Sequence, residues 1–223
     1  IFHSALGYKD VEFYQKEMFI RQLAWRDFAW YLCYFSPHIL RKNWKSEWDH
    51  FPWRENEDEL NNWKRGLTGQ PIVDAGMREM YITGRMHNRV RMIVGSYLTK
   101  HLLIDWRHGL KWFEDCLIDW DPASNAMGWQ WVAGSGPDAS PFFRVFNPEL
   151  QAKKFDPESK YQMKYLGLSF KRTPEVDKFF NMAPKSWKID EKSRPSTSIV
   201  DLKIGRDRAL NAYSKFKKII ADK

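Results

Sequence analysis

The sequence has few of the features that mark membrane, disulfide-bonded or metal-binding proteins. Charged residues interrupt the apolar runs well before the roughly 18 residues that a membrane-spanning helix needs, so we expect no membrane partner. Only two cysteines are present, Cys33 and Cys116, and neither has a second cysteine nearby. Disulfide frameworks, cysteine-based zinc sites and iron–sulfur clusters all need more cysteines at closer spacing. The sequence therefore predicts a cytoplasmic protein without a bound metal.

Strand signatures are scarce as well, which bears on the fold class. Alternating β-branched residues bounded by turns are almost absent, whereas apolar residues recur at three- and four-residue steps. The 223 residues, 43% of them hydrophobic, suffice for one domain with a sizeable core. We therefore predict a single all-α domain over residues 1–223, with a loop and a terminal helix in residues 185–223 that pack on it.

Capping residues, prolines and glycines set the expected limits of the helices. The first helix should span residues 10–35, and apolar residues on most of its sides predict that it is buried. Asn88 and Asp121 are good N-caps, and Gly66 and Gly84 are good stops. Further helices are expected over residues 57–64, 72–81, 89–103, 122–132 and 206–220, with two short ones opened by Asn147-Pro148 and Asp156-Pro157.

The chain has fewer acidic than basic residues. Lysine and arginine number 36 against 28 aspartate and glutamate residues, which gives a net charge of +8. Such a surplus attracts polyanions over long distances. It favours a nucleic-acid partner, although charge alone does not separate DNA from RNA or from an anionic membrane.

The densest cluster of polar and aromatic residues reads DWDPASNAMGWQW, from Asp119 onward. On the helix that Asp121 caps, Asn125 and Trp129 lie one turn apart and share a face, while Trp131 points about 200° away from Trp129. One helix thus offers an amide and an indole to one ligand and a second indole to another. The alternative is that both tryptophans belong to the core and that Asp121 is only a cap.

A second cluster reads GRMHNRVRM and places Asn88, Arg91 and Met92 on one helix face. Arg91 is suited to pairing with a carboxylate such as Asp119, and Arg89, which points elsewhere, is suited to a phosphate. A solvated basic face is the alternative. The histidine of this cluster has no partner at metal-ligand spacing, which again argues against a metal.

A third cluster interrupts the first helix with the polar residues Gln22, Arg26 and Asp27. Burying such side chains is costly unless a partner satisfies them, so their presence on a helix expected to be buried favours a ligand cavity. A mutual network between Arg26 and Asp27 is the alternative.

Taken in order, six segments make the chain resemble the photolyase and cryptochrome family from about Phe19 to Tyr213. They are residues 23–28 (LAWRDF), 69–78 (GQPIVDAGMR), 86–92 (MHNRVRM), 103–107 (LIDWR), 128–131 (GWQW) and 143–148 (FRVFNP). The resemblance implies the family's C-terminal, α-helical FAD-binding domain. It also implies that a DNA lesion enters a cavity above the flavin, photolyases being among the enzymes known to flip bases.

The resemblance assigns cofactor and electron-transfer roles to particular residues. Asn125 corresponds to the amide beside the flavin-ring nitrogen whose protonation it controls, and Asp119 corresponds to the carboxylate paired with Arg91. The whole implied set of FAD contacts is Arg26, Asn88, Arg91, Asp119, Asp121 and Asn125. Trp129, Trp106 and Trp53 match the family's chain of tryptophans, which relays electrons from the surface to photo-oxidised flavin; core packing is the alternative for each.

The resemblance also implies contacts with DNA. Trp25 and Trp131 match the two indoles that grip the flipped lesion in the family. Stacking on such an indole is worth about 1–3 kcal/mol per base. The other positions implied at the lesion, at the cavity rim or at DNA phosphates are Gln22, Arg26, Asn88, Arg89, Met92 and Arg144.

The chain departs from the family pattern at several positions. No segment matches the family's N-terminal α/β antenna domain or its Thr-Ser-x-Leu-Ser-Pro stretch, which holds the FAD phosphates. FAD retention is therefore in question, and we expect no antenna chromophore site. Because the chain starts at Ile1 and shows no secretory leader, we interpret it as a fragment or processed product. Gln22 replaces a glutamate usual in bacterial dimer-splitting enzymes, and Arg85 replaces a usual tryptophan.

Three functions compete at this point. The resemblance implies light-driven repair of cyclobutane pyrimidine dimers by electron transfer from reduced FAD, the activity of a bacterial class I-like deoxyribodipyrimidine photolyase. The expected partners are damaged DNA and the missing N-terminal part of the same protein. A cryptochrome-type blue-light photoreceptor and a cofactor-free DNA-binding fragment are the alternatives. Trp25, Trp131 and Met92 favour repair, because a photoreceptor needs no grip on a lesion.

Overall fold

The computed structural model describes residues 7, 12–142, 144–167, 172–190, 193, 195 and 197–221. Its regular elements in these ranges are all helical, which confirms the all-α prediction. In chain order they are α2 (Phe13–Phe35), η1 (Pro37–Leu40), η2 (Ser46–His50), α3 (Glu57–Lys64), α4 (Pro71–Thr83), α5 (Asn88–Ser96), η3 (Tyr97–His101), α6 (Trp106–Cys116), α7 (Pro122–Ala133), α8 (Pro148–Phe155), α9 (Lys160–Leu166), α10 (Pro174–Met182), η5 (Lys185–Trp187) and α11 (Leu202–Ala221).

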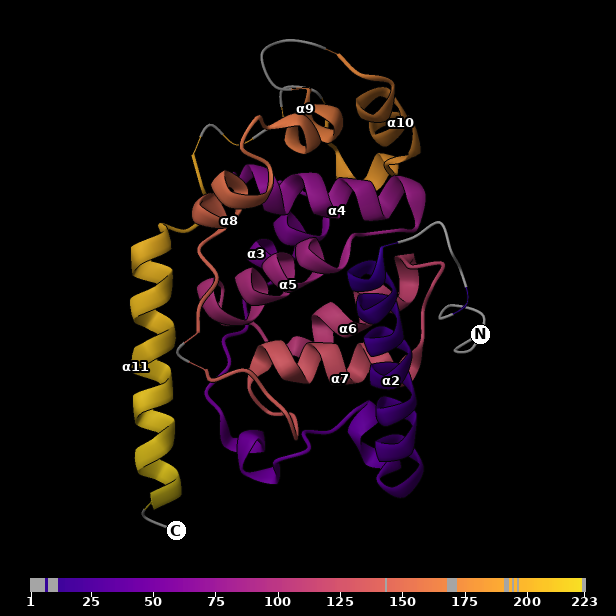
Figure 1. The fold of residues 1–223 in the computed structure, drawn as a ribbon. Coiled ribbons are helices and arrows are strands. Elements are labelled where there is room, and N and C mark those ends of the chain that lie inside the picture. Colours follow the sequence, from indigo (N-terminus) through magenta and orange to yellow (C-terminus); the bar gives the residue numbers. More distant parts are fainter. Residues whose placement is uncertain are drawn as a thin grey trace.

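The helices are stacked in layers, as Figure 1 shows. α9 and α10 lie above α4, and α5 lies between α4 and the pair formed by α6 and α7. α2 and α11 stand upright on opposite sides of this stack. Among the described helices, none is both long enough and apolar enough to cross a membrane.

The main core lies between α3, α4, α5, α6 and α7. Trp63, Tyr97 and Trp106 are fully buried there and belong to one apolar cluster with Met77 and Trp129. Each large apolar side chain that leaves water contributes about 1.5–3 kcal/mol to folding. The aromatic residues of the sequence thus fix α6 and α7 against the helices above them, and α7 carries much of the site described below.

Several helix limits agree with the sequence prediction because a local signal sets them. α3 covers the predicted residues and is followed by Gly66, whose φ is +62°. α4 ends at Gly84, which adopts the left-handed conformation with φ +69°. α7 begins after Asp121, whose Oδ1 accepts a hydrogen bond from the backbone nitrogen of Ser124 at 2.6 Å. In each case a residue next to the helix end satisfies the backbone or permits the turn.

Other limits were predicted wrongly. His87, not Asn88, is the N-cap of α5, since its Nδ1 accepts the backbone N–H of Arg89 at 3.1 Å. α5 ends at Ser96, and the chain continues as the π-helix η3. The N-cap of α9 is Ser159, and the carboxylate of Asp156 accepts the N–H groups of Tyr161 and Gln162 in its first turn, so α9 begins later than the Asp156-Pro157 pair indicated. The pattern also missed α6 and α10.

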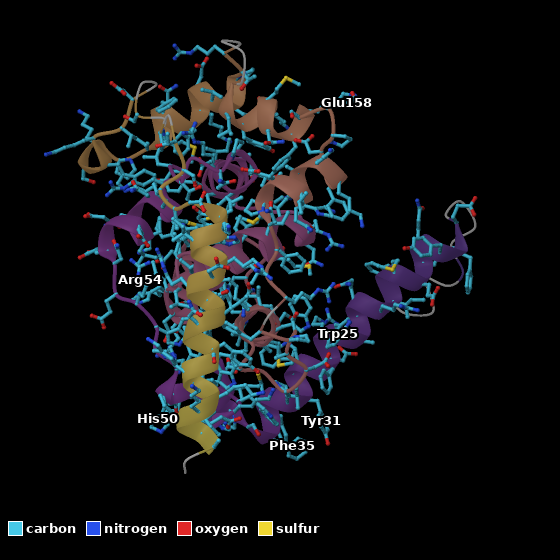
Figure 2. All side chains as sticks on the ribbon, turned by 90° about the vertical axis from the view of Figure 1, so that its left-hand side faces the viewer. Trp25, Tyr31, Phe35, His50, Arg54 and Glu158 are labelled. Carbon is cyan, nitrogen blue, oxygen red and sulfur yellow. The ribbon has the colours of Figure 1, made fainter. Side chains whose placement is uncertain are left out.

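The prediction that the first helix is buried on most sides is wrong for the described residues. α2 begins at Phe13, whereas the predicted start, Asp10, lies outside the described residues. Only Ala29 and Cys33 of this helix are buried. Figure 2 shows the reason: the C-terminal half of α2 lies against the other helices, while its N-terminal half extends away from them. Its most exposed aromatic residues are Phe13, Tyr14, Tyr31, Tyr34 and Phe35.

The C-terminal helix docks on the π-helix η3. α11 begins at Leu202, four residues before the predicted Arg206, because Asp201 accepts the backbone N–H of Ile204 at 2.9 Å. A Cβ on Gly205 would lie 3.0 Å from the Cα of His101, so a larger residue there would push the two helices apart by a few tenths of an ångström. These contacts bury His101, of whose surface 1% remains exposed.

Burial of His101 makes stability depend on pH. Burial lowers the pKa of His101 to about 4, from an ordinary value of 6.5. Between these pH values the unfolded chain binds a proton that the folded chain does not, so stability falls as the pH falls through this window, by about 3 kcal/mol in all.

We expect His101→Gln to flatten the loss of stability between pH 6.5 and pH 4.5 relative to the unsubstituted chain, as measured by urea unfolding at both pH values. The exposed His108 provides the matched control, because His108→Gln should leave the loss unchanged. Equal losses in the His101 variant and the unsubstituted chain would contradict the assignment.

Candidate functional site

One cavity collects most of the residues selected from the sequence. It has a volume of about 610 Å³ and is bounded mainly by α2, α5 and α7. This volume is within the roughly 300–1,000 Å³ of small-molecule and cofactor sites. The predicted residues that line it are Gln22, Trp25, Arg26, Asn88, Arg91, Met92, Asp119, Asn125, Trp129 and Trp131. The three sequence clusters, far apart in the chain, therefore meet in one hollow.

Helix α7 supplies the cavity with one amide and two indoles. Asn125 is 8% exposed, and its Nδ2 donates to the backbone oxygen of Asp121 at 3.0 Å. No described residue donates to the Oδ1 of Asn125. Trp129 and Trp131 also line the cavity, while Trp129 belongs to the main core cluster and Trp131 packs against it.

An ion pair stands at the edge of the cavity, as the sequence predicted. The Nη2 of Arg91 donates to both carboxylate oxygens of Asp119, at 3.0 and 2.8 Å. The Nε of the same arginine donates to the backbone oxygen of Met86 at 2.8 Å, which fixes the plane of the guanidinium. Because 56% of the Asp119 side chain is exposed, solvent screens the ion pair. The pair therefore adds little to the stability of the fold, and its main effect is to hold the Arg91 guanidinium in a fixed position.

The wall formed by α2 differs from what the sequence suggested. Gln22, Arg26 and Asp27 are exposed, so the argument that a ligand must offset their burial is wrong. The alternative contact between Arg26 and Asp27 is present at 3.6 Å, but both side chains are more than half exposed. Gln22 and Arg26 nevertheless line the cavity together with Trp25, which is 47% exposed (Figure 2).

Five predicted site residues do not line the cavity. The carboxylate of Asp121 is occupied by the cap on Ser124 and by the Nε1 of Trp30, which donates to Oδ2 at 2.9 Å. The guanidinium of Arg89 lies over the ring of Phe155, at 4.6 Å from its centroid. Arg144 lies over Phe146 in the same manner, 5.6 Å from the centroid. The other two are Trp53 and Trp106, and Phe143 of the FRVFNP motif lies outside the described residues.

The three tryptophans assigned to electron relay belong to one packed region. Trp129 and Trp106 are members of the main core cluster, and Trp53 packs against it. The Nε1 atoms of Trp129 and Trp53 are buried and have no hydrogen-bond partner within the described part of the chain. The Nε1 of Trp106, in contrast, donates to Oδ1 of Asn43 at 2.9 Å.

Sequence reasoning missed about half of the cavity wall. The missed residues are mostly small or apolar, which no local pattern distinguishes from ordinary core: Ala29, Met86, Gly95, Phe113, Ser124, Met127, Gly128, Val132, Gly136, Pro137 and Asp138. No sequence pattern indicated that Gly136 and Pro137 lie beside the cavity. A Cβ on Gly128 would meet nothing within 4 Å, so this glycine keeps the helix surface open toward the cavity.

The composition of the cavity fits a large, flat, partly polar cofactor. Apolar walls supply stacking surfaces, while a few convergent polar groups fix orientation, which is the usual make-up of cofactor sites. Asn125 is 8% exposed, and no hydrogen bond from a described residue to its Oδ1 is present. No three His, Cys, Asp or Glu side chains of the described ranges gather as metal ligands. The expectation of a metal-free site stays a prediction.

The helical fold and this cavity define a class: a cofactor-binding domain in which an amide, an ion pair and several indoles face one hollow. The family model described as "FAD binding domain of DNA photolyase" matches residues 19–215. The chain therefore belongs to the family of DNA photolyase FAD-binding domains.

Individual relatives agree with this assignment. The chain is 47% identical over 211 residues to a deoxyribodipyrimidine photo-lyase of Agrobacterium fabrum, covering 90% of this chain and 43% of the relative. It is 40% identical over 207 residues to the photo-lyase of Escherichia coli, again over 90% of this chain and 42% of the relative. The chain thus spans less than half the length of these relatives.

Solved structures give the same picture. A bacterial class III photolyase from Agrobacterium tumefaciens superposes with a TM-score of 0.84 at 46% identity, over 97% of this chain and 46% of that one. A cryptochrome from Synechocystis superposes with a TM-score of 0.75 at 33% identity, over 92% of this chain and 43% of that one. The likeness to both confirms the photolyase and cryptochrome resemblance drawn from the six segments.

The position of Trp129 depends on a glycine of the neighbouring helix. A Cβ on Gly109 of α6 would overlap the six-membered ring of the Trp129 indole. We expect Gly109→Ala to destabilise the fold by about 1–3 kcal/mol, because the indole must shift within a packed core. Urea unfolding measures the change.

Gly128→Ala is the matched control, since it places the same methyl group in a helix interior without any contact. Its helix propensity should raise stability by about 0.5–1 kcal/mol. Equal stability of the Gly109 and Gly128 variants would show that the indole does not rest on α6 as described.

Proposed function

We propose that this chain binds FAD in the cavity and forms the catalytic part of a deoxyribodipyrimidine photolyase, which repairs cyclobutane pyrimidine dimers in DNA under light. The observation that carries the proposal is the convergence of Asn125, the Arg91–Asp119 pair and the indoles of Trp25 and Trp131 on one hollow. The relatives named above support it, because each is a photo-lyase or a cryptochrome.

The cofactor side of the cavity is formed by the polar groups of α5 and α7. When bound, reduced FAD supplies the electron that splits the dimer after excitation by light. Arg91, held by both Asp119 and the Met86 carbonyl, presents a fixed cation to the ring system, and Asn125 presents a fixed amide. Arg26 and Asn88 line the same cavity and complete the proposed contacts. Asp121 acts indirectly, because its carboxylate is already used to hold α2 and α7.

The lesion side of the cavity is formed by α2 and the end of α7. Trp25 and Trp131 offer two indole faces on which the bases of a flipped dimer stack. Gln22 offers an amide that both donates to and accepts from thymine edges, but it supplies neither charge nor proton. Met92, on α5, lines the same cavity and adds a polarisable apolar contact.

Basic residues outside the cavity suit the DNA backbone. Arg89 and Arg144 are each stacked on a phenylalanine ring, which orders the side chain before any phosphate arrives. With Arg26 and the net charge of +8, they favour docking of DNA that weakens as the salt concentration rises. We assign these residues to phosphate contacts rather than to recognition of base sequence.

Trp129, Trp106 and Trp53 are proposed to relay electrons toward the cavity. Trp129 lines the cavity, and all three pack in or against the same core cluster. Two of the indoles are buried and Trp53 is partly buried, so together they give an electron a path from the surface to the cavity. In this role the relay restores reduced cofactor and takes no part in splitting the dimer.

Two measurements on the purified chain distinguish this function from the alternatives. Flavin absorbance after addition of FAD tests cofactor binding, and its absence would leave the cofactor-free DNA-binding fragment. Repair of an oligonucleotide that contains a thymine dimer, under blue light with reduced FAD, tests the reaction. Light-driven flavin reduction without repair would favour a photoreceptor of the cryptochrome type.

The lesion grip predicts a selective loss of affinity. Trp131→Ala should weaken binding of dimer-containing DNA roughly 5- to 150-fold, which corresponds to the about 1–3 kcal/mol of one stacked base, and should spare undamaged DNA. A gel-shift titration with both DNAs measures this. Trp187→Ala removes a half-buried indole that does not line the cavity and serves as the control. Equal losses on both DNAs would contradict a role for Trp131 in the grip.

A further inference from the structure

Two kinds of contact attach α2 to α7 near the cavity. Ala29 and Cys33 form a small apolar cluster with Ala123 of α7. Beside this cluster, the Nε1 of Trp30 donates to Oδ2 of Asp121 at 2.9 Å. The apolar contact brings the two helices together, but attraction between such side chains depends little on direction. The hydrogen bond, in contrast, requires a particular orientation of its donor and its acceptor.

The carboxylate that accepts from Trp30 is itself held by α7. Its Oδ1 accepts the backbone N–H of Ser124 at 2.6 Å, which fixes Asp121 at the start of this helix. Hydrogen bonds to a charged acceptor are stronger than those between neutral groups. Because Trp30 is 47% exposed, water competes for the contact, and its contribution to the stability of the fold is small. The main effect of Trp30 is therefore to relate the rotation of α2 about its own axis to the position of α7.

The rotation of α2 decides where its cavity residues point. Gln22, Trp25 and Arg26 line the cavity from this helix, and Trp25 lies near its middle, where the helix begins to extend away from the others (Figure 2). Side chains reach about 5–6 Å from a helix axis, so a rotation of about 20° moves their ends by about 2 Å. Such a displacement exceeds the roughly 0.5 Å within which a binding constellation has to be held.

We propose that Trp30 is a positioning residue for the lesion, which sets the gap between the Trp25 and Trp131 indoles through its hydrogen bond to Asp121. This inference rests on the proposed function, because it takes these two indoles as the grip on the dimer. Both halves of the grip take their position from one carboxylate, α7 through its cap and α2 through Trp30. Trp30 does not line the cavity, so its effect on the lesion is indirect.

The test removes the hydrogen bond and keeps an aromatic ring at the same place. Trp30→Phe lacks the N–H donor. Tyr34→Phe is the matched control, because it removes a polar group from an exposed ring of the same helix, and that hydroxyl makes no hydrogen bond to a described residue. Gel-shift titrations of the chain with FAD, on dimer-containing and on undamaged DNA, give the ratio of the two affinities.

We expect Trp30→Phe to lower this ratio about fivefold or more, because the Trp25 indole no longer stays in place to stack on the dimer, and Tyr34→Phe to leave it unchanged. The affinity for undamaged DNA and the midpoint of urea unfolding should be the same for both variants. A merely structural role of Trp30 would lower that midpoint and both affinities together. An unchanged ratio in Trp30→Phe, or equal losses on both DNAs, would overturn the inference.

A measurement without flavin or DNA separates this inference from the proposed function. In the ¹⁵N-labelled chain, the indole N–H signal of Trp25 should shift and broaden in Trp30→Phe, since α2 then samples several rotations, and stay in place in Tyr34→Phe. The signal of Trp131 should stay in place in both variants, because the core holds α7. An unmoved Trp25 signal in Trp30→Phe would sink the inference even if the unsubstituted chain repairs dimers. If the chain bound no lesion, the proposed function would fail, and the Trp25 signal would still decide whether Trp30 sets the position of that indole.

Discussion

The carboxylate of Asp121 holds the two main walls of the cavity together. One oxygen caps α7 through the backbone of Ser124, and the other accepts the indole N–H of Trp30 from α2. This one side chain therefore links the helix that carries Asn125, Trp129 and Trp131 to the helix that carries Gln22 and Trp25, beside the apolar contact of Ala29 and Cys33 with Ala123. Since α2 is buried only at Ala29 and Cys33, the Trp30–Asp121 hydrogen bond and this small apolar contact together hold the α2 wall beside α7.

The site combines rigid and open parts in a way that suits its proposed chemistry. α7 is fixed by its cap, by the main core and by Gly109, which lets the Trp129 indole lie directly on α6. The α2 wall, in contrast, presents exposed polar and aromatic side chains to the same hollow. A cofactor gains from fixed amide and guanidinium groups, whereas a large lesion needs a wall with accessible indole faces.

Much of the fold and a good part of the site could be predicted from local sequence. The limits of α3 and α4, the cap on α7 and the Arg91–Asp119 pair are all present as expected. The burial of α2 was predicted wrongly. Apolar residues on a helix surface show that burial would be favourable, but not that another part of the chain packs there. The hydrogen bond from Trp30 to Asp121 was missed for a similar reason, because the local sequence that marks Asp121 as a cap does not show what its second oxygen contacts.

By itself, the sequence determined the helices, their caps and the residue types of the site, because these depend on neighbours within a few positions. The family followed as well, since six ordered motifs are preserved along the chain. Only the tertiary structure decided which residues share the cavity, which tryptophan finds a hydrogen-bond acceptor and which face of α2 stays exposed. Those outcomes depend on contacts such as Trp30–Asp121 and Asn43–Trp106, which join distant segments and arise only when the helices pack.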